Sequence, residues 1–457
     1  MKKIYSKIIG TGSHDISTDR IIANNDIPER TFYDAQKNPI QKTTSEVLKK
    51  FQEITGTKKR HYAAEYKVTS DLGIEAGKEA IRSANVNPDD VDCLIFATNF
   101  RDVATKTDKV DLVPSYAALI KNDMQIINPA VIAYDVIISG YNSARKLEML
   151  EDCLGLGSKD LVVHIDGHRK ENLFERAKYH FSKCSVDKES LNSIVVVHYF
   201  GQDSFESAPS LIEKVENELG LFNPNLLSYE IVFGCPGFLQ AMIQANTMIT
   251  CGKRKNILVI GAEMLSRVMD TSDVDSNLYA DGGGAVFMKA VESDEPLGML
   301  FHKVRSDTLN QQACMIWMGE SYDPNHDDPK ELFLKMLGTR VHKHALRHIP
   351  LMIKEALEEA KIPIEKIAKM VFHQPNPLML EEITLRTFAQ FNRPVPENIM
   401  PIIGDTYGNP SVACIPLILD RMYKGTWENH KIKSGDIILF FSIGAGMNMN
   451  IAFYKVP

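Results

Sequence analysis

The regular alternation of short apolar runs with longer amphipathic segments constrains the fold of this chain more than any other feature. Such apolar runs are typical of buried strands, and amphipathic segments of this length are typical of helices that cover a sheet. The predicted strands are 94–98, 131–138, 161–165, 194–198, 227–233, 257–260, 285–289, 370–372, 437–441 and 449–454. The predicted helices are 70–84, 209–219, 236–251, 348–360, 378–391 and 411–423. The pattern predicts an α/β protein.

Composition and charge exclude several classes of protein. The chain has 457 residues, of which 44% are hydrophobic, so it can bury a large core divided among two or three domain-sized units. Its formal charge of -7 leaves no broad basic face, and we expect no nucleic-acid partner.

The cysteines and the N-terminus are those expected of a cytoplasmic protein. The seven cysteines form no CxxC pair and no zinc-like spacing, as is typical of reduced thiols in the cytoplasm. The N-terminus lacks the apolar core of a signal peptide, and no stretch approaches the roughly 20 apolar residues that a membrane helix requires. We therefore expect a cytoplasmic protein without a membrane segment.

An internal repeat is a second feature of the chain. The dipeptide Pro114-Ser115 recurs as Pro209-Ser210, and Asn128-Pro129 recurs as Asn223-Pro224, each 95 positions later. Turn dipeptides that recur in the same order predict that a unit of about a hundred residues occurs twice.

The two predicted copies are 66–165 and 166–262. They are not equivalent, because position 140, which corresponds to Cys235 in the second copy, is Gly. We therefore expect only the second copy to carry a nucleophile.

The residues around Cys235 are those of a nucleophile at the start of a helix. An apolar run ends at Phe233 and is followed by Gly234, Cys235 and Pro236, and proline is favoured in the first turn of a helix. Free N–H groups and the helix dipole at such a position stabilise a thiolate. We predict that Cys235 is reactive and that the other six cysteines are small apolar residues of the core.

His373 and Asn409 also follow or precede predicted elements. His373 ends a strand-like segment, so we expect it at the carboxyl edge of a sheet, where α/β proteins hold their chemistry. Asn409 precedes Pro410 and a predicted helix, where it could also be a plain N-cap. A thiol, an imidazole and a carboxamide together predict acyl-thioester chemistry, because the last two can bind an oxygen that becomes negative.

The sequence offers little for a metal or a cofactor. His344 and His348 lie one helical turn apart, but no acidic residue is placed as in His-Glu-x-x-His, so we expect a solvated helix face. Asp281-Gly-Gly-Gly284 does not open a dinucleotide-binding βαβ unit. We predict no metal and no cofactor.

These motifs resemble those of the β-ketoacyl-ACP synthase III family, the condensing enzymes of the thiolase fold. The family's Cys-Gly-Phe turn resembles Cys235-Pro-Gly-Phe238, its His-Gln-Ala-Asn resembles His373-Gln-Pro-Asn376, and its Gly-Asn-Thr-Ser resembles Gly408-Asn-Pro-Ser411. Ile260-Gly-Ala-Glu-Met-Leu-Ser-Arg267 is also similar. Within the family, Ser442-Ile-Gly-Ala-Gly-Met-Asn448 looks most like the ketosynthases of dialkylresorcinol and flexirubin-type biosynthesis.

The resemblance implies a thiolase-like fold of two pseudo-symmetric βαβαβ halves in α-β-α-β-α layers, here with a duplicated N-terminal unit. Residues 1–300 would form the N-terminal half with Cys235, and residues 301–457 the C-terminal half with His373 and Asn409.

The resemblance also implies a reaction. Cys235 takes an acyl group from a thioester, and His373 and Asn409 bind the carbonyl of a second thioester whose enolate attacks the acyl carbon. The N–H groups of Cys235 and Ala445 hold the tetrahedral oxyanion. In most of the family the second substrate is malonyl-ACP. In the resorcinol-type enzymes it is a β-ketoacyl chain, and a further bond closes a ring to a cyclohexanedione or resorcinol precursor.

One departure from the family concerns the acyl donor. The tryptophan and arginine that sandwich coenzyme A adenine in the family lie just before a Thr-Gly pair, whereas here Ile54 precedes Thr55-Gly56. We therefore expect thioesters of acyl carrier protein rather than of coenzyme A. Arg386, on the helix after His373, is a candidate contact for an acidic carrier, with a solvated helix charge as the alternative.

Two other functions stay open. An acyltransferase could use the same acyl-enzyme to make an ester or amide, and Asn409 argues against it because an enolate needs two donors whereas an alcohol or amine needs mainly a base. A catalytically silent partner subunit would explain the repeat, but it would not explain an intact trio.

The repeat also bears on assembly. Without residues 138–231 the chain would have 363 residues, a normal length for the family, whose homodimers pair the strand before the nucleophile antiparallel across a two-fold axis. The extra copy is expected to place 131–138 beside 226–233 within one chain, giving a pseudo-dimeric monomer. The alternatives are a homodimer through that strand and a copy that only appends strands.

Overall fold

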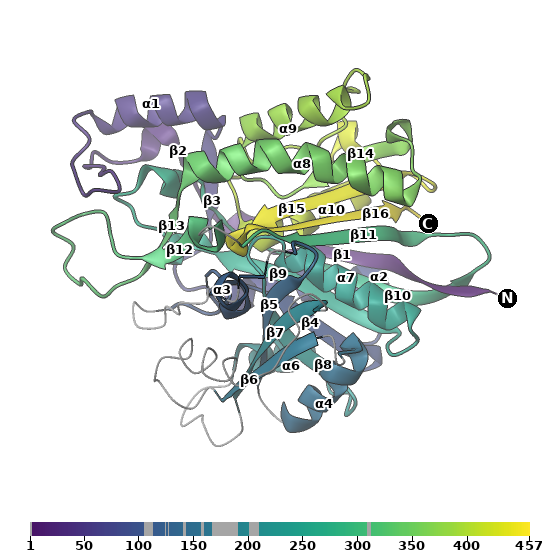
Figure 1. Ribbon diagram of the computed structural model, residues 1–457. Coiled ribbons are helices and arrows are strands. Elements are labelled where there is room, and N and C mark those ends of the chain that lie inside the picture. The colour runs from purple at the N-terminus through teal and green to yellow at the C-terminus, as the bar shows by residue number, and fades with distance from the viewer. Residues whose placement is uncertain are drawn as a thin grey trace.

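A computed structural model shows two stacked sheets with helices between and outside them (Figure 1). It describes residues 2–104, 113–123, 125–126, 128–139, 143–156, 160–166, 191–200, 210–308 and 312–457.

The larger sheet contains both antiparallel and parallel strands. Its order is β1 (Lys3–Ser13), β10 (Asp281–Ser293), β9 (Asn256–Met264), β4 (Cys93–Ala97), β8 (Leu227–Val232), β5 (Ile132–Ser139), β7 (Ser193–Phe200) and β6 (Asp160–Asp166). Strands β9, β4 and β8 run parallel to one another, as do β5, β7 and β6. The two parallel groups meet at the antiparallel pair β8 and β5.

The smaller sheet has four strands. Its order is β11 (Gly298–Ser306), β16 (Asn448–Lys455), β15 (Ile437–Gly444) and β14 (Ile367–Phe372). Two antiparallel two-stranded sheets lie outside the two larger ones, β2 (Arg20–Ala23) with β3 (Lys59–Tyr62) and β12 (Ile316–Gly319) with β13 (Phe333–Met336). Every strand of the larger sheet precedes residue 294 and every strand of the smaller sheet follows residue 297.

The helices complete a five-layered α-β-α-β-α arrangement, which confirms the predicted layer order (Figure 1). Helices α2 (Thr69–Ala84) and α6 (Leu211–Leu219) cover the outer face of the larger sheet. Helices α7 (Gly237–Thr250) and α10 (Cys414–Tyr423) lie between the sheets. Helices α8 (Gly338–Ala360) and α9 (Pro377–Ala389) cover the smaller sheet. Within the described residues, the remaining α-helices are α1 (Thr44–Thr55), α3 (Tyr116–Asp123) and α4 (Ser143–Leu154).

The sequences of the helices explain their layers. Nearly every residue of α7 is buried, as a helix between two sheets requires, whereas α2 and α8 each bury one face. The predicted start of α8 at residue 348 is wrong, because the helix begins at Gly338 and continues through Pro350. Among the described helices, none combines the length and the apolar character that a bilayer span needs.

The predicted pairing of residues 131–138 with 226–233 is confirmed. In the antiparallel β5–β8 pair, Val136 lies opposite Ile231. Exchanging β4 with β7, β5 with β8, and β6 with β9 gives the same order of these six strands read from the other end, and these are the strands that correspond in the sequence repeat. The duplication itself stays a prediction, and two of the residues on which it depends, Gly140 and Pro209, lie outside the described residues.

Candidate active site

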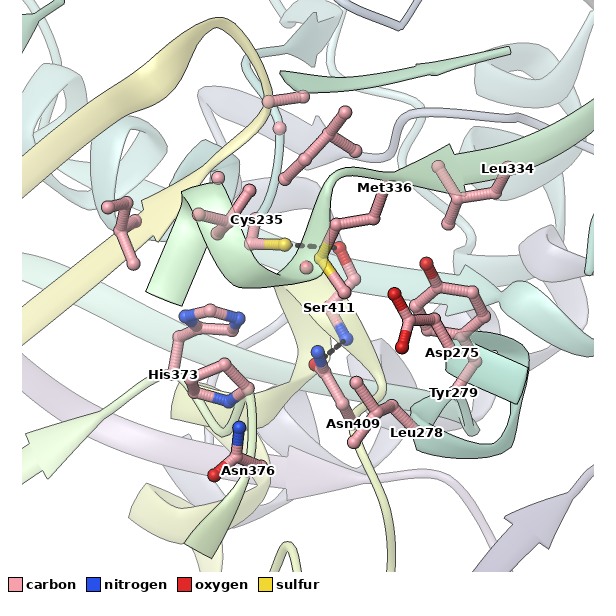
Figure 2. Close-up of a pocket in the computed structure, with 18 of the residues that line it drawn as sticks. Cys235, Asp275, Leu278, Tyr279, Leu334, Met336, His373, Asn376, Asn409 and Ser411 are labelled. Atoms are coloured by element: carbon pink, nitrogen blue, oxygen red, sulfur yellow. Dashed lines mark hydrogen bonds between the residues drawn. The ribbon is translucent and has the colours of Figure 1, made fainter. Parts of the chain in front are cut away.

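One cavity of about 440 Å³ holds Cys235, His373 and Asn409. Its walls come from both halves of the chain, so residues far apart in sequence meet there (Figure 2). The apolar part of the wall is formed by Ile54, Phe100, Val113, Leu265, Leu278, Ile316, Leu334, Met336, Val341, Met379 and Ile443. A cavity with mostly apolar walls and a few convergent polar groups is the usual form of a small-molecule site.

Cys235 lies in the turn that joins the fully buried strand β8 to α7. Gly234, with φ of 70°, makes this turn, and a side chain there would come within 2.6 Å of the backbone nitrogen of Ala445. The turn is therefore packed directly against the loop after β15, which brings the N–H groups of Cys235 and Ala445 close together.

The thiol of Cys235 is protonated in this environment. Burial raises its pKa to about 11, which outweighs the lowering by a hydrogen bond from Ser411 Oγ, 3.4 Å from Sγ. The helix start was expected to ionise the thiol, and this expectation is wrong because burial disfavours the thiolate more strongly. A base must therefore take the proton when the thiol reacts.

His373 follows β14 at the carboxyl edge of the smaller sheet, as predicted. Its backbone N–H donates to the carbonyl of Phe441 at 3.0 Å, and its side chain is 5% exposed. Burial lowers the pKa of His373 to about 3, so the imidazole is neutral at physiological pH. Its Nε2 bonds no group of the described chain, which leaves this nitrogen for a substrate.

The backbone and side chain of Asn409 are both fixed. Its N–H donates to the carbonyl of Leu278 at 2.8 Å, and its own carbonyl accepts from the N–H of Ala280 at 3.0 Å. Its Oδ1 accepts from the N–H of Ser411 at 2.9 Å and from Cys414 Sγ at 3.4 Å. Because Oδ1 is occupied, the amide nitrogen is the group of Asn409 that can donate to a ligand.

A series of hydrogen-bonded polar side chains leads to Cys235, and the sequence did not predict it. Glu263 accepts from Asn99 Nδ2 at 2.7 Å, and Asn99 Nδ2 also lies 3.4 Å from Ser411 Oγ, the donor to Cys235. Burial raises the pKa of Glu263 to about 7. A glutamate inside the apolar run Ile257–Met264 was the available signal, because buried carboxyl groups need partners.

Arg386 does not line the cavity. Its guanidinium is about half exposed on α9 and pairs with Glu382 at 2.6 Å. Burial, and then the charge of Arg386, lower the pKa of His342, which does line the cavity. The side chain is therefore at the surface close to the site, and its contact with a carrier stays a prediction.

The expected solvated face for His344 and His348 is wrong. His344 is 7% exposed, and its Nε2 lies 3.2 Å from the carboxylate of Asp307, an acidic neighbour that is distant in sequence. The rings of His344 and His348 are in contact, with centroids 4.3 Å apart. Asp307 also accepts from Arg305 Nε at 2.7 Å, so the carboxylate already has a cationic partner.

Comparisons with known proteins identify relatives of this chain. Family models for 3-oxoacyl-acyl-carrier-protein synthase III and for its C-terminal part match residues 229–308 and 357–456. A β-ketoacyl-acyl-carrier-protein synthase III of Prochlorococcus marinus is 31% identical over 274 residues, which are 59% of this chain and 76% of the relative.

Solved structures share the fold. The 3-oxoacyl-acyl-carrier-protein synthase III of Aquifex aeolicus has a TM-score of 0.59 and 20% identity, over 98% of this chain and 99% of that chain. The priming β-ketosynthase of a polyketide biosynthetic pathway has a TM-score of 0.62 and 19% identity, over 100% of this chain and 97% of that chain. Both likenesses establish the thiolase-like architecture.

Proposed function

The chain belongs to the β-ketoacyl-acyl-carrier-protein synthase III family, and we propose that it is a ketosynthase that joins a Cys235-bound acyl group to a second acyl thioester. The observation that carries the proposal is the single cavity that Cys235, His373 and Asn409 line together. A nucleophile, a neutral imidazole and a fixed carboxamide are the groups that acyl transfer and enolate formation require.

In the first half-reaction the sulfur of Cys235 attacks the carbonyl carbon of the donor thioester. The neutral imidazole of His373 takes the thiol proton, and the N–H groups of Cys235 and Ala445 bind the oxyanion. When the tetrahedral intermediate collapses, the carrier thiol leaves with a proton and the acyl group stays on the sulfur. The close packing of Gly234 against Ala445 supports this oxyanion site.

In the second half-reaction His373 and Asn409 donate hydrogen bonds to the carbonyl oxygen of the second thioester. The enolate of that thioester forms when its bond to the carboxylate breaks and carbon dioxide leaves, or when its α-carbon gives a proton to solvent. The enolate attacks the acyl carbon, and the sulfur of Cys235 leaves as a thiolate that takes a proton from solvent. If the second substrate is a β-ketoacyl chain, as in the resorcinol-type enzymes that the sequence resembles, a further carbon–carbon bond closes a ring.

The wall at Ile54 supports acyl carrier protein as the donor of the acyl group. Ile54 lines the cavity and is 61% exposed, so an aliphatic side chain stands at its mouth where an adenine clamp is expected in the family. We propose that the carrier protein itself supplies the missing contacts, with Arg386 as one cationic group at this surface.

The arrangement of Asn409 favours condensation over its alternatives. Transfer to an alcohol or amine needs mainly a base, whereas an enolate needs two hydrogen-bond donors. Three hydrogen bonds with backbone groups hold Asn409 in place, and its amide nitrogen is available as the second donor. A silent partner subunit has no need of a cavity with all three groups.

We also propose that one chain is a pseudo-dimer. The edge of β8 at which a second copy would pair is occupied by β5 of the same chain, in the antiparallel direction that a two-fold axis requires. A homodimer through β8 would have to displace β5.

Mass spectrometry of the intact protein after mixing with acyl-carrier-protein thioesters tests the enzymatic proposal. One acyl adduct is expected on the wild type, and none on Cys235→Ala. Cys251→Ala is the matched control and should keep the adduct. The core position expected for Cys251 is wrong, because Cys251, like Cys314, is exposed, and it lies outside the cavity. Release of a β-keto product on addition of malonyl- or β-ketoacyl-carrier protein distinguishes condensation from transfer. Absence of any adduct on the wild type would favour the silent subunit.

A further inference from the structure

Asp275 introduces a carboxyl group into the wall of the same cavity. It lies in the 3-10 turn Val274–Leu278, where its N–H donates to Asp273 Oδ1 at 3.0 Å and orients the residue. In Figure 2, Asp275 lies beside Tyr279 and Leu334, with Cys235 and His373 on the other side of the view. The carboxyl group therefore faces the space that a bound acyl chain would share with the nucleophile.

The carboxyl group of Asp275 lies against the start of α8. A side chain at Gly338, the first residue of that helix, would come within 2.7 Å of Asp275 Oδ2. Glycine at this position gives the carboxyl group its room.

Among the residues that the structure describes, Asp275 differs from the aspartates beside it because no group donates a hydrogen bond to its carboxyl oxygens. Asp270 accepts from the N–H of Tyr322 at 2.7 Å and from Lys335, and Lys335 also lies 3.5 Å from Asp273. Lys335 is thus paired with two other carboxylates, and it acts on Asp275 through its charge, which partly offsets the rise in the pKa of Asp275. Within the described chain no side chain or backbone group donates to the carboxyl oxygens of Asp275, although an unpaired polar group in apolar surroundings is costly.

The surroundings of Asp275 allow its carboxyl group either to donate or to accept a hydrogen bond. Burial, followed by the charge of Asp273, raises the pKa of Asp275 to about 7. Near neutral pH it is therefore present both as an acid, which donates to a ketone oxygen, and as a carboxylate, which accepts from a hydroxyl group. Leu278, Leu334 and Met336 line the same cavity with apolar side chains, and a hydrogen bond to a ligand is stronger in such surroundings than in water.

We propose that Asp275 hydrogen-bonds an oxygen atom carried by the acyl chain of the substrate, so that the cavity selects keto- or hydroxyacyl thioesters over saturated ones of equal length. This inference rests on the ketosynthase function proposed above. A saturated chain would leave the carboxyl group without a partner, and a site that loses a hydrogen bond in this way discriminates strongly.

A competition experiment tests the selectivity. The wild type is mixed with equal amounts of carrier-protein thioesters of one chain length: saturated, β-keto, β-hydroxy and hydroxylated at the chain end. The adducts on Cys235 are then counted by intact-protein mass spectrometry. We expect at least one oxygenated chain to exceed the saturated chain roughly tenfold or more, as expected for a hydrogen bond that one substrate makes and the other lacks.

Two variants separate the hydrogen bond from packing. Asp275→Leu should remove the preference, whereas Asp275→Asn, with a similar shape and retained hydrogen bonding, should keep part of it. Asp294→Leu is the matched control because Asp294 is exposed and outside the cavity, and it should leave the ratio of adducts unchanged.

The failures of the two proposals differ. The role of Asp275 would be overturned if the wild type forms adducts without preferring any oxygenated chain. It would also be overturned if Asp275→Leu keeps the preference. Either result would leave the proposed ketosynthase function intact. A wild type without any adduct would overturn both.

Discussion

The hydroxyl of Ser411 donates a hydrogen bond to the sulfur of Cys235 over 3.4 Å, joining the nucleophile to the loop that carries Asn409. Because the bond stabilises the thiolate, it works against the burial that raises the pKa of Cys235. Ser411 thus connects the two halves of the site at the atom that must ionise.

Ser411→Ala should make Cys235 less reactive. Loss of the hydrogen bond raises the pKa of the thiol further, so less thiolate is present at any pH below it. A neutral hydrogen bond contributes about 0.5–1.5 kcal/mol, which predicts about two- to tenfold slower alkylation by iodoacetamide. Peptide mapping by mass spectrometry would follow Cys235 alone. Thr387→Ala, which removes a buried hydroxyl that bonds only its own helix, should leave the rate unchanged, and an unchanged rate in Ser411→Ala would refute the link.

His373→Gln should change how stability depends on pH. The pKa of His373 is about 3 in the folded chain and about 6.5 when unfolded, so the unfolded chain binds the extra proton between these values. Its contribution is fully present above about pH 6.5 and is lost as the pH falls. From about pH 7 to about pH 5, the free energy of unfolding of the wild type should fall about 2 kcal/mol more than that of the variant. Urea unfolding at both pH values measures the difference, and parallel losses in the two proteins would contradict it.

The sequence predicted the buried strands and the meeting of Cys235, His373 and Asn409 in one cavity, but not the electrostatics of that cavity. All ten predicted strands are present because continuous apolar runs identify them, whereas the polar strand Lys59–Tyr62 carries no such signal. The helix predicted over 348–360 begins earlier, at Gly338, and continues through Pro350.

The remaining wrong predictions concern how deeply single side-chain atoms are buried. Such burial depends on tertiary packing, which a local sequence pattern does not show. The protonated state of Cys235 follows from enclosure by residues of both halves, and the pairing of His344 with Asp307 joins positions that no local pattern connects. Asp275 stood in a polar turn, and only the arrangement of α8 against that turn makes it part of the cavity.

Gly234→Ala should disturb the oxyanion site more than it disturbs folding. The new side chain would meet the backbone of Ala445 at 2.6 Å and push the two N–H groups apart. Loss of one oxyanion donor costs about a hundredfold to a thousandfold in rate. Gly252→Ala is the control for backbone strain, because Gly252 has φ of 72° but open space around it. Acylation rates and melting temperatures of the two variants separate the effects, and equal rates would contradict the assignment.

Val113→Phe should shorten the acyl chains that Cys235 accepts. Val113 is 3% exposed, its carbonyl accepts from the N–H of Met318 at 3.1 Å, and its side chain lines the cavity. A larger ring there fills space at a cost of about 1–3 kcal/mol in stability, whereas Val113→Ala should admit longer chains. Adduct yields for a series of saturated carrier thioesters give the profile, and coincident profiles for the three proteins would exclude Val113 from the acyl-binding wall.

Covalent cross-linking can decide whether β8 pairs within one chain. Val136 and Ile231 lie directly opposite in the β5–β8 pair, so the double variant Val136→Cys/Ile231→Cys should form an intramolecular disulfide on mild oxidation. Light scattering should then still give the mass of one chain, 51.3 kDa. The single variant Ile231→Cys is the control, because two β8 strands paired across a two-fold axis would bring this cysteine near its copy. Because β5 already covers that edge, we expect no cross-linked dimer, and a disulfide between two Ile231→Cys chains would show that β8 pairs with a second copy.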